Sequence, residues 1–253
     1  MTTVNVNMPA LCVHQPLDSR AKLNYRYRNL LLNGNFDVWQ RGSSFAVAAE
    51  QYTADRWLLT LFGSVLRSAF LPGESEEMGN AAYYLSAVPA VGAAYISQRI
   101  PDVRTLAGKD AVLSFWAKGT AGDTVPISAI QVFGTGGTPS TSVDNTIADV
   151  TLTTAWKRHE VTASIATILG KTIGTNDDSY LQLRFAIPLS GMDIAHVQLE
   201  EGTLATDFED LPLHEEERRC RHYYEVVTPA DGVVVATGLY VSTYVARFPF
   251  FYE

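Results

Sequence analysis

The chain has 253 residues, of which 47% are hydrophobic and 18% are charged, and its net charge is −8. A chain of this length and hydrophobicity can bury a sizeable core, which excludes intrinsic disorder and favours one large domain with appendages over two full domains. The acidic balance argues against a nucleic-acid-binding protein, because such proteins present a basic face to the phosphates.

Membrane and export signals are missing from the sequence. No window approaches the roughly 18 apolar residues that a spanning helix needs, so we expect no membrane insertion. The first residues lack the basic start and apolar core of a secretory signal. The two cysteines, Cys12 and Cys220, fit neither a disulfide framework nor a metal-ligand spacing. We therefore expect reduced thiols and synthesis in a reducing cytoplasm.

Residues 1–28 differ in composition from the rest of the chain. They contain two prolines and four basic residues against a single acidic one, Asp18. Their apolar content is too low for independent folding. We expect an extended N-terminal arm that orders against a partner, the alternative being a loose tail.

From residue 29 onward, short runs of β-branched and aromatic residues recur between turn residues. The alternation of apolar and polar residues is clearest at residues 181–185, as in a strand with one buried face. Many short strands without intervening helices predict an all-β, antiparallel β-sandwich. The expected strands are residues 56–62, 81–87, 95–100, 111–117, 125–133, 156–162, 180–185 and 193–199.

Two other segments interrupt or follow this pattern. Residues 134–149 are polar and rich in glycine, serine and threonine, which predicts a long surface loop. Residues 213–224 predict the one short helix, because an acidic first turn and basic later turns match the helix dipole. The expected organisation is an attachment arm at 1–28, a sandwich at 29–210, and a helix with a C-terminal β segment at 211–253.

The chain stops on the aromatic run at residues 247–253. Each exposed phenylalanine there would forgo about 1.5–3 kcal/mol of burial. We therefore expect this end either to be truncated from a longer chain or to pack against another subunit.

The sequence contains no recognisable catalytic constellation. Its five histidines form no spaced cluster, and no Gly-x-Ser-x-Gly motif occurs. The glycine-rich loop at residues 134–138 is followed by Pro139 rather than by a helix, so it does not predict a phosphate site. We expect a protein that is not an enzyme, although spacing alone leaves open a site assembled from distant strands.

Aromatic side chains beside polar ones are candidates for glycan binding, since sugar C–H faces pack on rings while hydroxyls bond nearby polar groups. The candidate residues are Trp39, Gln40, Arg41 and Tyr52, the last close to Asp55. The alternative for these residues is packing in the core or at an interface. We expect the other three tryptophans to face the core; they are Trp57, Trp116 and Trp156.

Three stretches together resemble a known pattern. The first is Asn29-Leu-Leu-Leu-Asn-Gly-Asn-Phe-Asp-Val-Trp-Gln-Arg-Gly42, followed by residues 52–57; the second is residues 106–119 followed by 156–162; the third is residues 197–209 leading into 218–224. In this order they are similar to the carbohydrate-binding-module-like jelly-roll domain in tail-fibre and related tail proteins of bacteriophages and prophages. The resemblance covers about residues 29–225.

This resemblance implies a virion protein near the host-contacting end of a phage tail. It implies a homotrimer, attachment to other phage tail proteins through residues 1–28, contact with host surface polysaccharide, and release from the bacterial cytoplasm by lysis. Related modules often hold a structural calcium ion through oxygen ligands. The matching positions are Asn35, Asp37 and Asp193, but Asp37 is shorter than the usual glutamate and Asp193 has no second carboxylate beside it. We expect no other cofactor.

Other functions remain open at this point. The chain could be a purely structural virion connector that never touches the host. It could also be the carbohydrate-binding accessory of a glycan-degrading enzyme, which requires a catalytic domain elsewhere in the protein. A hydrolase activity of this chain itself is the most distant alternative.

Overall fold

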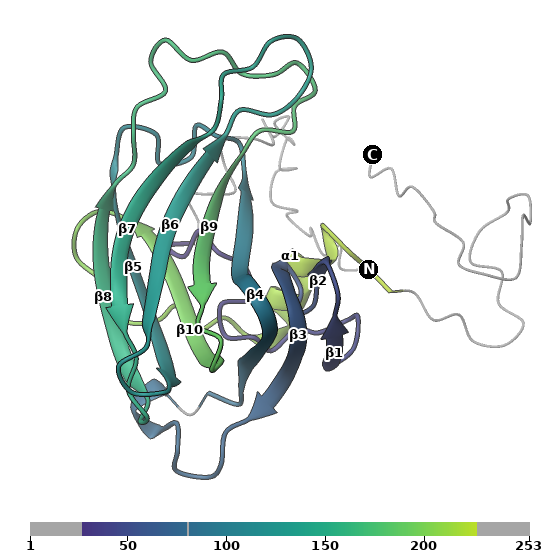
Figure 1. Ribbon diagram of the computed structural model, residues 1–253, viewed down its shortest axis with the longest axis vertical. Helices are drawn as coiled ribbons and strands as arrows, with labels where there is room; N and C mark the ends of the chain where they lie inside the picture. Colours follow the sequence, from purple (N-terminus) through teal and green to yellow (C-terminus); the bar gives the residue numbers. More distant parts are fainter. Residues whose placement is uncertain (1–26, 80, 227–253) are drawn as a thin grey trace, which may run out of the picture.

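The computed structural model describes residues 27–79 and 81–226 (Figure 1). Most of the expected N-terminal arm, together with Cys12, and the expected C-terminal β segment beyond residue 226 lie outside this range. No helix in the described part of the chain is long and apolar enough to cross a membrane.

Ten strands, one short 3-10 helix and one α-helix make up the described fold. The strands are β1 (Ser44–Val47), β2 (Glu50–Tyr52), β3 (Trp57–Ala69), β4 (Tyr83–Pro101), β5 (Asp110–Gly119), β6 (Thr124–Val132), β7 (Val143–Thr151), β8 (Lys157–Ser164), β9 (Tyr180–Ile187) and β10 (Met192–Glu201). The 3-10 helix η1 is Glu76–Met78, and the α-helix α1 is Leu213–Arg221.

The strands form two layers that share β4. All pairs are antiparallel, in the order β7-β6-β9-β4-β10-β5-β8, with β3 also pairing with β4. Residues 94–101 of β4 pair with β9, whereas residues 85–87 pair with β10. One layer therefore contains β6, β7 and β9 and the other contains β5, β8 and β10, as Figure 1 shows. The predicted all-β jelly-roll sandwich is confirmed.

The core lies between these layers and follows the alternation of side chains along each strand. In β9, Leu181, Leu183 and Phe185 are fully buried, and the intervening residues face outward. Across the layers, Phe115 of β5 contacts Phe185 edge to face, with 5.2 Å between ring centroids. This geometry is favourable for two aromatic rings and links the layers at their centre.

One long strand replaces two predicted ones. Residues 81–87 and 95–100 were expected as separate strands, but β4 runs continuously from residue 83 to residue 101. The pairing of β3 with β4 shifts register around residues 60–63, and Gly92 has a positive φ of 72°. A bulge and a glycine of this kind allow a strand to bend from one layer into the other.

The predicted loop at residues 134–149 is wrong in its second half, because residues 143–151 form β7. Only Val150 of this strand is fully buried, so its sequence carries a weak hydrophobic signal. The strand is fixed by pairing with β6, and Asn145 Nδ2 donates to the Ala129 carbonyl at 2.9 Å. The predicted helix is confirmed, although it ends at Arg221.

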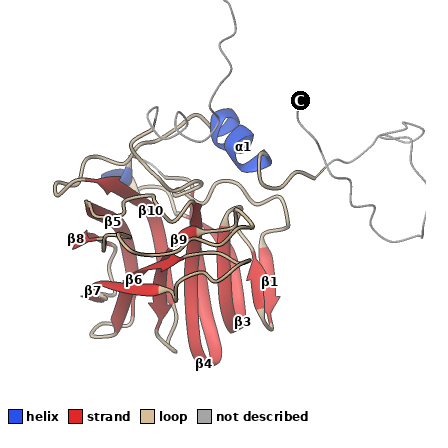
Figure 2. Cartoon of the chain, turned by 90° about the horizontal axis from the view of Figure 1, so that it is seen from above, coloured by secondary structure: helices blue, strands red, loops and turns tan. Residues whose placement is uncertain are grey.

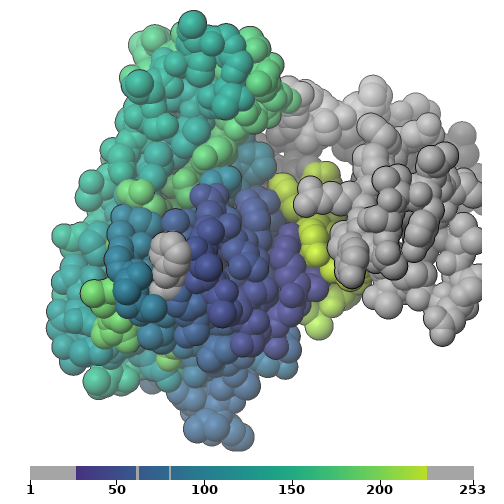
Figure 3. All heavy atoms as spheres, turned by 45° about the vertical axis from the view of Figure 1, so that its right-hand side comes forward, coloured from purple at the N-terminus to yellow at the C-terminus, as the bar shows by residue number. Residues whose placement is uncertain are grey.

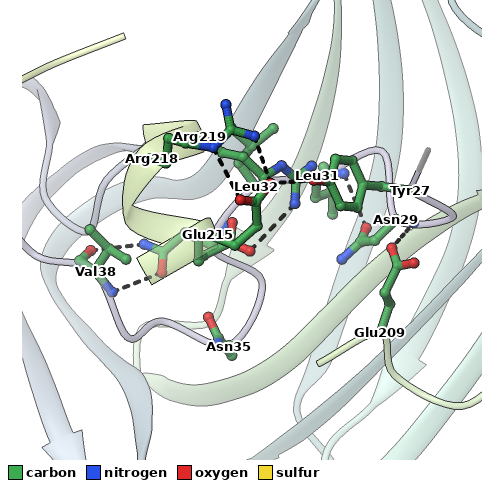
Figure 4. Close-up of polar contacts among 12 residues, drawn as sticks. Tyr27, Asn29, Leu31, Leu32, Asn35, Val38, Glu209, Glu215, Arg218 and Arg219 are labelled. Carbon is green, nitrogen blue, oxygen red and sulfur yellow. Dashed lines mark hydrogen bonds and ion pairs between the residues drawn. The ribbon is translucent and has the colours of Figure 1, made fainter. Parts of the chain in front are cut away.

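The residues before β1 fill the interior without forming a strand. Leu31, Phe36 and Trp39 belong to the core. Asn29 Oδ1 accepts hydrogen bonds from the backbone amides of Leu31 and Leu199. The backbone amide of Asn29 donates to Glu209 Oε2 at 3.0 Å (Figure 4). These bonds attach the start of the sandwich to its last strand.

Helix α1 lies outside the two layers (Figure 2) and packs against the early residues of the fold (Figure 3). The carboxylate of Glu216 accepts a 2.5 Å hydrogen bond from the Asn33 amide and pairs with Arg219. Tyr27 and Arg218 both bond Glu215 (Figure 4). The helix is therefore held on the residues that begin the sandwich.

Candidate functional site

The outer face of the β5 layer carries an unusual pair of side chains. In β5, Phe115 and Ala117 point into the core, so Trp116 and Lys118 point outward. Lys118 lies directly opposite Asp193 in the pairing of β5 with β10. This part of the sheet thus presents an indole and an ion pair side by side.

Two loops rise around these residues and form a pocket of about 430 Å³. One loop connects β3 to β4 and includes η1; the other precedes β8 and carries Trp156. The pocket is lined by Gly73, Glu74, Glu76, Glu77, Met78, Trp116, Lys118, Thr154, Ala155 and Trp156. It combines two half-buried tryptophans with several charged groups.

Trp156 is held rigidly by an aromatic cluster behind it. Its ring centroid lies 5.0 Å from that of Phe70 and 5.2 Å from that of Tyr84, and these two rings are 4.8 Å apart. The Trp156 indole nitrogen also donates to Glu74 Oε1 at 3.1 Å. A ring fixed in this way can receive a ligand with little further ordering.

Lys118 occupies the centre of the polar part of the pocket. Its Nζ lies 3.0 Å from Glu74 Oε1, 3.7 Å from Asp193 Oδ2 and 4.8 Å from the Trp156 ring. Burial opposes its charge, but the bond to Glu74 and the nearby Tyr84 and Asp193 outweigh burial and raise the pKa of Lys118. The ammonium therefore stays charged and is already paired.

The pKa values of the two carboxylates around Lys118 are shifted in opposite directions. The backbone amide of Leu71 and the ammonium of Lys118 hold the pKa of Glu74 below its usual range. Burial raises the pKa of Asp193, and bonds from Ser86 and Lys118 oppose that rise. Glu74 is thus a permanent carboxylate at neutral pH.

Some polar groups in the pocket have no partner among the residues that the structure describes. Within residues 27–79 and 81–226, the indole nitrogen of Trp116 meets no acceptor, and the carboxylates of Glu76 and Glu77 form no hydrogen bond or ion pair. A ligand could therefore stack on a ring, accept a hydrogen bond from Trp116 and donate hydrogen bonds to the carboxylates. This is the combination that a sugar requires.

The expectation that Trp116 and Trp156 face the core was wrong. Both are half-buried and line the pocket, whereas Trp57 is fully buried and donates to the Asn33 carbonyl at 2.8 Å. Adjacent residues of a strand point to opposite faces, so Phe115 and Trp116 cannot both face inward. That rule could have identified Trp116; Trp156 precedes its strand and gave no such signal.

The four residues predicted to bind glycan lie close to one another but do not line the pocket of Trp116 and Trp156. Trp39 is only 9% exposed and its indole nitrogen donates to the Phe36 carbonyl at 2.6 Å. Arg41 pairs with Asp55 at 3.0 Å and lies over the rings of Tyr224, at 3.4 Å, and Tyr52, at 5.5 Å. Gln40 Nε2 donates to the Tyr224 carbonyl at 2.8 Å. Gln40 and Arg41 hold the segment after α1, whereas Trp39 and Gln40 line a second pocket. The contact of these four residues with glycan stays a prediction.

The expected calcium ligands are not brought together as one set. Asn35 Nδ2 donates to Asp37 Oδ2 at 2.8 Å. Asp193, on β10, instead lies 3.7 Å from the ammonium of Lys118 on β5. Within residues 27–79 and 81–226 no group of three or more histidine, cysteine or acidic residues could hold a metal ion. The donor set therefore does not fit a calcium ion shared by these three residues.

Asp37 itself has an unusual environment. Its Oδ1 is buried and has no hydrogen-bond partner in the described structure. Burial raises the pKa of Asp37 to about 6, with further contributions from Asp210 and Glu216 that Arg67 opposes. The side chain lines the second pocket, which has a volume of about 430 Å³ and is formed by residues 37–40, by Arg67, by residues 82–83 and by α1.

No protein-family model matches the chain, and no curated protein matches it. Several solved structures are similar in fold. The enzymatically active domain of tailspike protein 4 from bacteriophage CBA120 is 17% identical, with a TM-score of 0.39, over 69% of this chain and 22% of that one. A putative sugar-binding protein from Bacteroides thetaiotaomicron is 14% identical, with a TM-score of 0.45, over 69% of this chain and 100% of that one.

A third similar structure is the CBM22-1 xylan-binding domain of Xyn10C from Paenibacillus barcinonensis. It is 12% identical, with a TM-score of 0.41, over 70% of this chain and 96% of that one. Similarity at this level does not identify the function of the chain.

Proposed function

We propose that this chain is a non-catalytic binding and structural component of a phage tail, and that it contacts host surface glycan through the pocket of Trp116 and Trp156. The observation that supports glycan binding is the pair of half-buried tryptophans in one pocket. They lie beside the ion pair of Lys118 with Glu74 and beside the carboxylates of Glu76 and Glu77, which pair with no described residue. The phage-tail part rests on the sequence motifs in residues 29–225.

Glycan binding would use two kinds of contact within the pocket, stacking on aromatic rings and hydrogen bonding to polar groups. Aromatic rings present negative faces, on which the C–H groups of a pyranose ring can pack. Carboxylates accept hydroxyl protons in charge-assisted hydrogen bonds, which are stronger than neutral ones. Trp156 supplies a rigid ring, Trp116 supplies an indole donor, and Glu76 and Glu77 supply acceptors.

In this proposal the chain acts as a trimer attached through residues 1–28 to other tail proteins. Three linked sites can raise the overall avidity by about 10²–10⁴ over one site, so each pocket can bind weakly. Synthesis in the bacterial cytoplasm and incorporation into the virion follow from the same proposal.

Direct binding measurements test this function. The full-length chain should bind an array of host surface polysaccharide fragments, and Trp156→Ala or Trp116→Ala should each lower the affinity at least about tenfold, equivalent to about 1.4 kcal/mol. Tyr95→Ala is a matched control, because Tyr95 is a half-buried aromatic residue on β4 beneath Arg184 and away from the pocket.

Each other outcome has a clear meaning. Loss of binding in Tyr95→Ala alone would move the site to the β9 layer and contradict the pocket. Absence of binding to any fragment, together with loss of virion incorporation on deleting residues 1–28, would favour the purely structural connector.

Hydrolysis by this chain is the most distant alternative; it would use Glu74 and Asp193, which lie on either side of Lys118 and have pKa values shifted in opposite directions. Enzymes use such pairs as base and acid. However, Asp193 lies beneath Lys118 and does not line the pocket. Release of reducing sugar from a bound polysaccharide, lost in Glu74→Gln, would establish hydrolysis and contradict the non-catalytic proposal.

A further inference from the structure

The charges of the pocket are strongly unbalanced. Three carboxylates line it, those of Glu74, Glu76 and Glu77, against the single ammonium of Lys118. Lys118 is already paired with Glu74 and lies near Asp193, which adds a further acidic group beneath the pocket. The pocket therefore has an excess of negative charge.

The carboxylates that pair with no described residue belong to the exposed part of the pocket lining. Glu76 and Glu77 belong to η1, are exposed, and have no partner within the described residues. Gly79 follows with a φ of 65°, and its amide bonds the Glu76 carbonyl, which closes the short helix. A ligand in the pocket therefore lies beside two solvent-exposed acidic side chains.

From this distribution we infer that the pocket selects uncharged sugars and rejects acidic ones such as uronic or sialic acids and phosphorylated sugars. The inference rests on the proposed glycan-binding function and specifies its substrate class. It follows from the arrangement of Glu76, Glu77 and the paired Lys118.

Two effects act against an anionic sugar. First, its charge is repelled by Glu76 and Glu77, neither of which forms an ion pair with a described residue. Second, Lys118 is already engaged by Glu74 and Asp193, so moving its ammonium onto an anion would weaken the bond to Glu74 and leave that carboxylate with only the Leu71 amide and the Trp156 indole. The pocket would thus discriminate against anionic sugars both by charge repulsion and by the cost of disturbing an existing hydrogen-bond network.

An uncharged sugar meets neither penalty. Its hydroxyls can donate to Glu76 and Glu77 and accept from the free indole nitrogen of Trp116, while the ion pair of Lys118 and Glu74 remains intact. The same carboxylates that repel an acid therefore bind a neutral ring.

The test compares one glycan in two charge states. The best-binding neutral oligosaccharide from the array is oxidised at its primary hydroxyls to the uronate form, and both forms are titrated into the full-length chain at 20 mM salt. We expect the oxidised form to bind at least about tenfold more weakly, equivalent to about 1.4 kcal/mol. Raising the salt to 500 mM should reduce this ratio, because exposed charges are screened.

Charge-neutral variants locate the effect. In the double variant Glu76→Gln and Glu77→Gln, the ratio between neutral and oxidised ligand should fall below about threefold. The double variant Asp149→Asn and Glu225→Gln is the matched control, because it removes the same number of charges from residues that do not line the pocket. It should keep the original ratio.

The results separate the two proposals. Preferred binding of an acidic glycan, equal binding of the two forms, or an unchanged ratio in the Glu76 and Glu77 double variant would overturn the charge selection and leave glycan binding standing. Absence of binding to every fragment would instead overturn the glycan-binding function, and the selection with it.

Discussion

The outer face of β5 and β10 has a sealed half and an open half, although both lie on the same two strands. In the sealed half, Val112, Ser114 and Gln198 are fully buried beneath residues 202–209, which fold back over them. In the open half, Trp116 and Lys118 line the candidate pocket. The two halves are only one outward-facing position apart along β5.

Hydrogen bonds explain the sealed half. The Gln198 amide nitrogen donates to Glu200 and to the Asp207 carbonyl, and its oxygen accepts from the Glu209 amide at 2.7 Å. Glu200 accepts from Thr206 through both its oxygens. The buried amide of Gln198 and the carboxylate of Glu200 are therefore satisfied by the chain itself and have no need of a ligand.

Arg158 marks the boundary between the halves. It lies opposite Trp116 in the pairing of β5 with β8, and its Nη2 donates to the Thr206 carbonyl at 2.7 Å. Polar residues on a sheet face therefore support stability where a loop covers them and can support binding where none does. Substitutions on either side of this boundary test the division.

The largest effect is expected from Gly34→Ala, next to the sealed half. A Cβ on Gly34 would lie 2.2 Å from the Val197 carbonyl oxygen, and the Gly34 carbonyl accepts from the Val197 amide at 2.9 Å. We expect a loss of about 3 kcal/mol in the free energy of unfolding, measured by urea denaturation. Gly79→Ala, in the loop beside the pocket with nothing within 4 Å, should cost only about 1 kcal/mol.

A smaller loss is expected from Gln198→Ala. It removes the acceptor of the part-buried Glu209 amide and one of the three donors to the Glu200 carboxylate, which should cost about 2 kcal/mol in urea denaturation. The affinity for glycan should not change, since Gln198 does not line the pocket. A variant of wild-type stability would show that the covering loop contributes nothing.

Asp37 is neither fully covered nor open to solvent: its side chain is half-buried, and its Oδ1 has no hydrogen-bond partner among the described residues. Its pKa is raised to about 6 in the fold, so the folded state binds this proton more tightly than the unfolded state. The resulting stabilisation is present below about pH 4 and is lost as the pH rises through about 6. Solvent screening reduces it to about 1 kcal/mol.

The measurement for this residue is the stability difference between Asp37→Asn and wild type across pH. The asparagine does not titrate, so the variant should gain about 1 kcal/mol relative to wild type between pH 4 and pH 7. A difference that stays constant over this range would contradict the raised pKa.

The smallest change in stability is expected in the open half. Trp116→Ala should lower the free energy of unfolding by less than about 1 kcal/mol, because the ring is half-buried and its indole nitrogen has no acceptor among the described residues. Its thermal unfolding should resemble that of wild type while glycan affinity falls. A large loss of stability would assign Trp116 to packing instead.

Much of the fold could be predicted from the sequence because its signals are local. Alternation identified β9 through Leu181, Leu183 and Phe185, and the charges of residues 213–221 identified α1. The edge strand β7 was missed, since the alternation of buried and exposed positions is weak where few side chains are covered.

The candidate site could not be predicted in the same way. Ser114 and Trp116 occupy equivalent outward positions of β5, and only the path of residues 202–209 decides which one is covered. Glu74, Lys118 and Trp156 are far apart in the chain and meet through the order of the strands. Neighbour relationships of this kind depend on topology rather than on local pattern.

The sharing of β4 between both layers has a consequence for how the molecule comes apart. Since its residues 85–87 and 94–101 are hydrogen-bonded to strands of opposite layers, neither layer can open without disturbing the other. Amide protons along this strand should exchange with solvent only when the entire sandwich unfolds, and both layers should show the same opening free energy. The described body would then behave as a single cooperative unit, with no separately melting half.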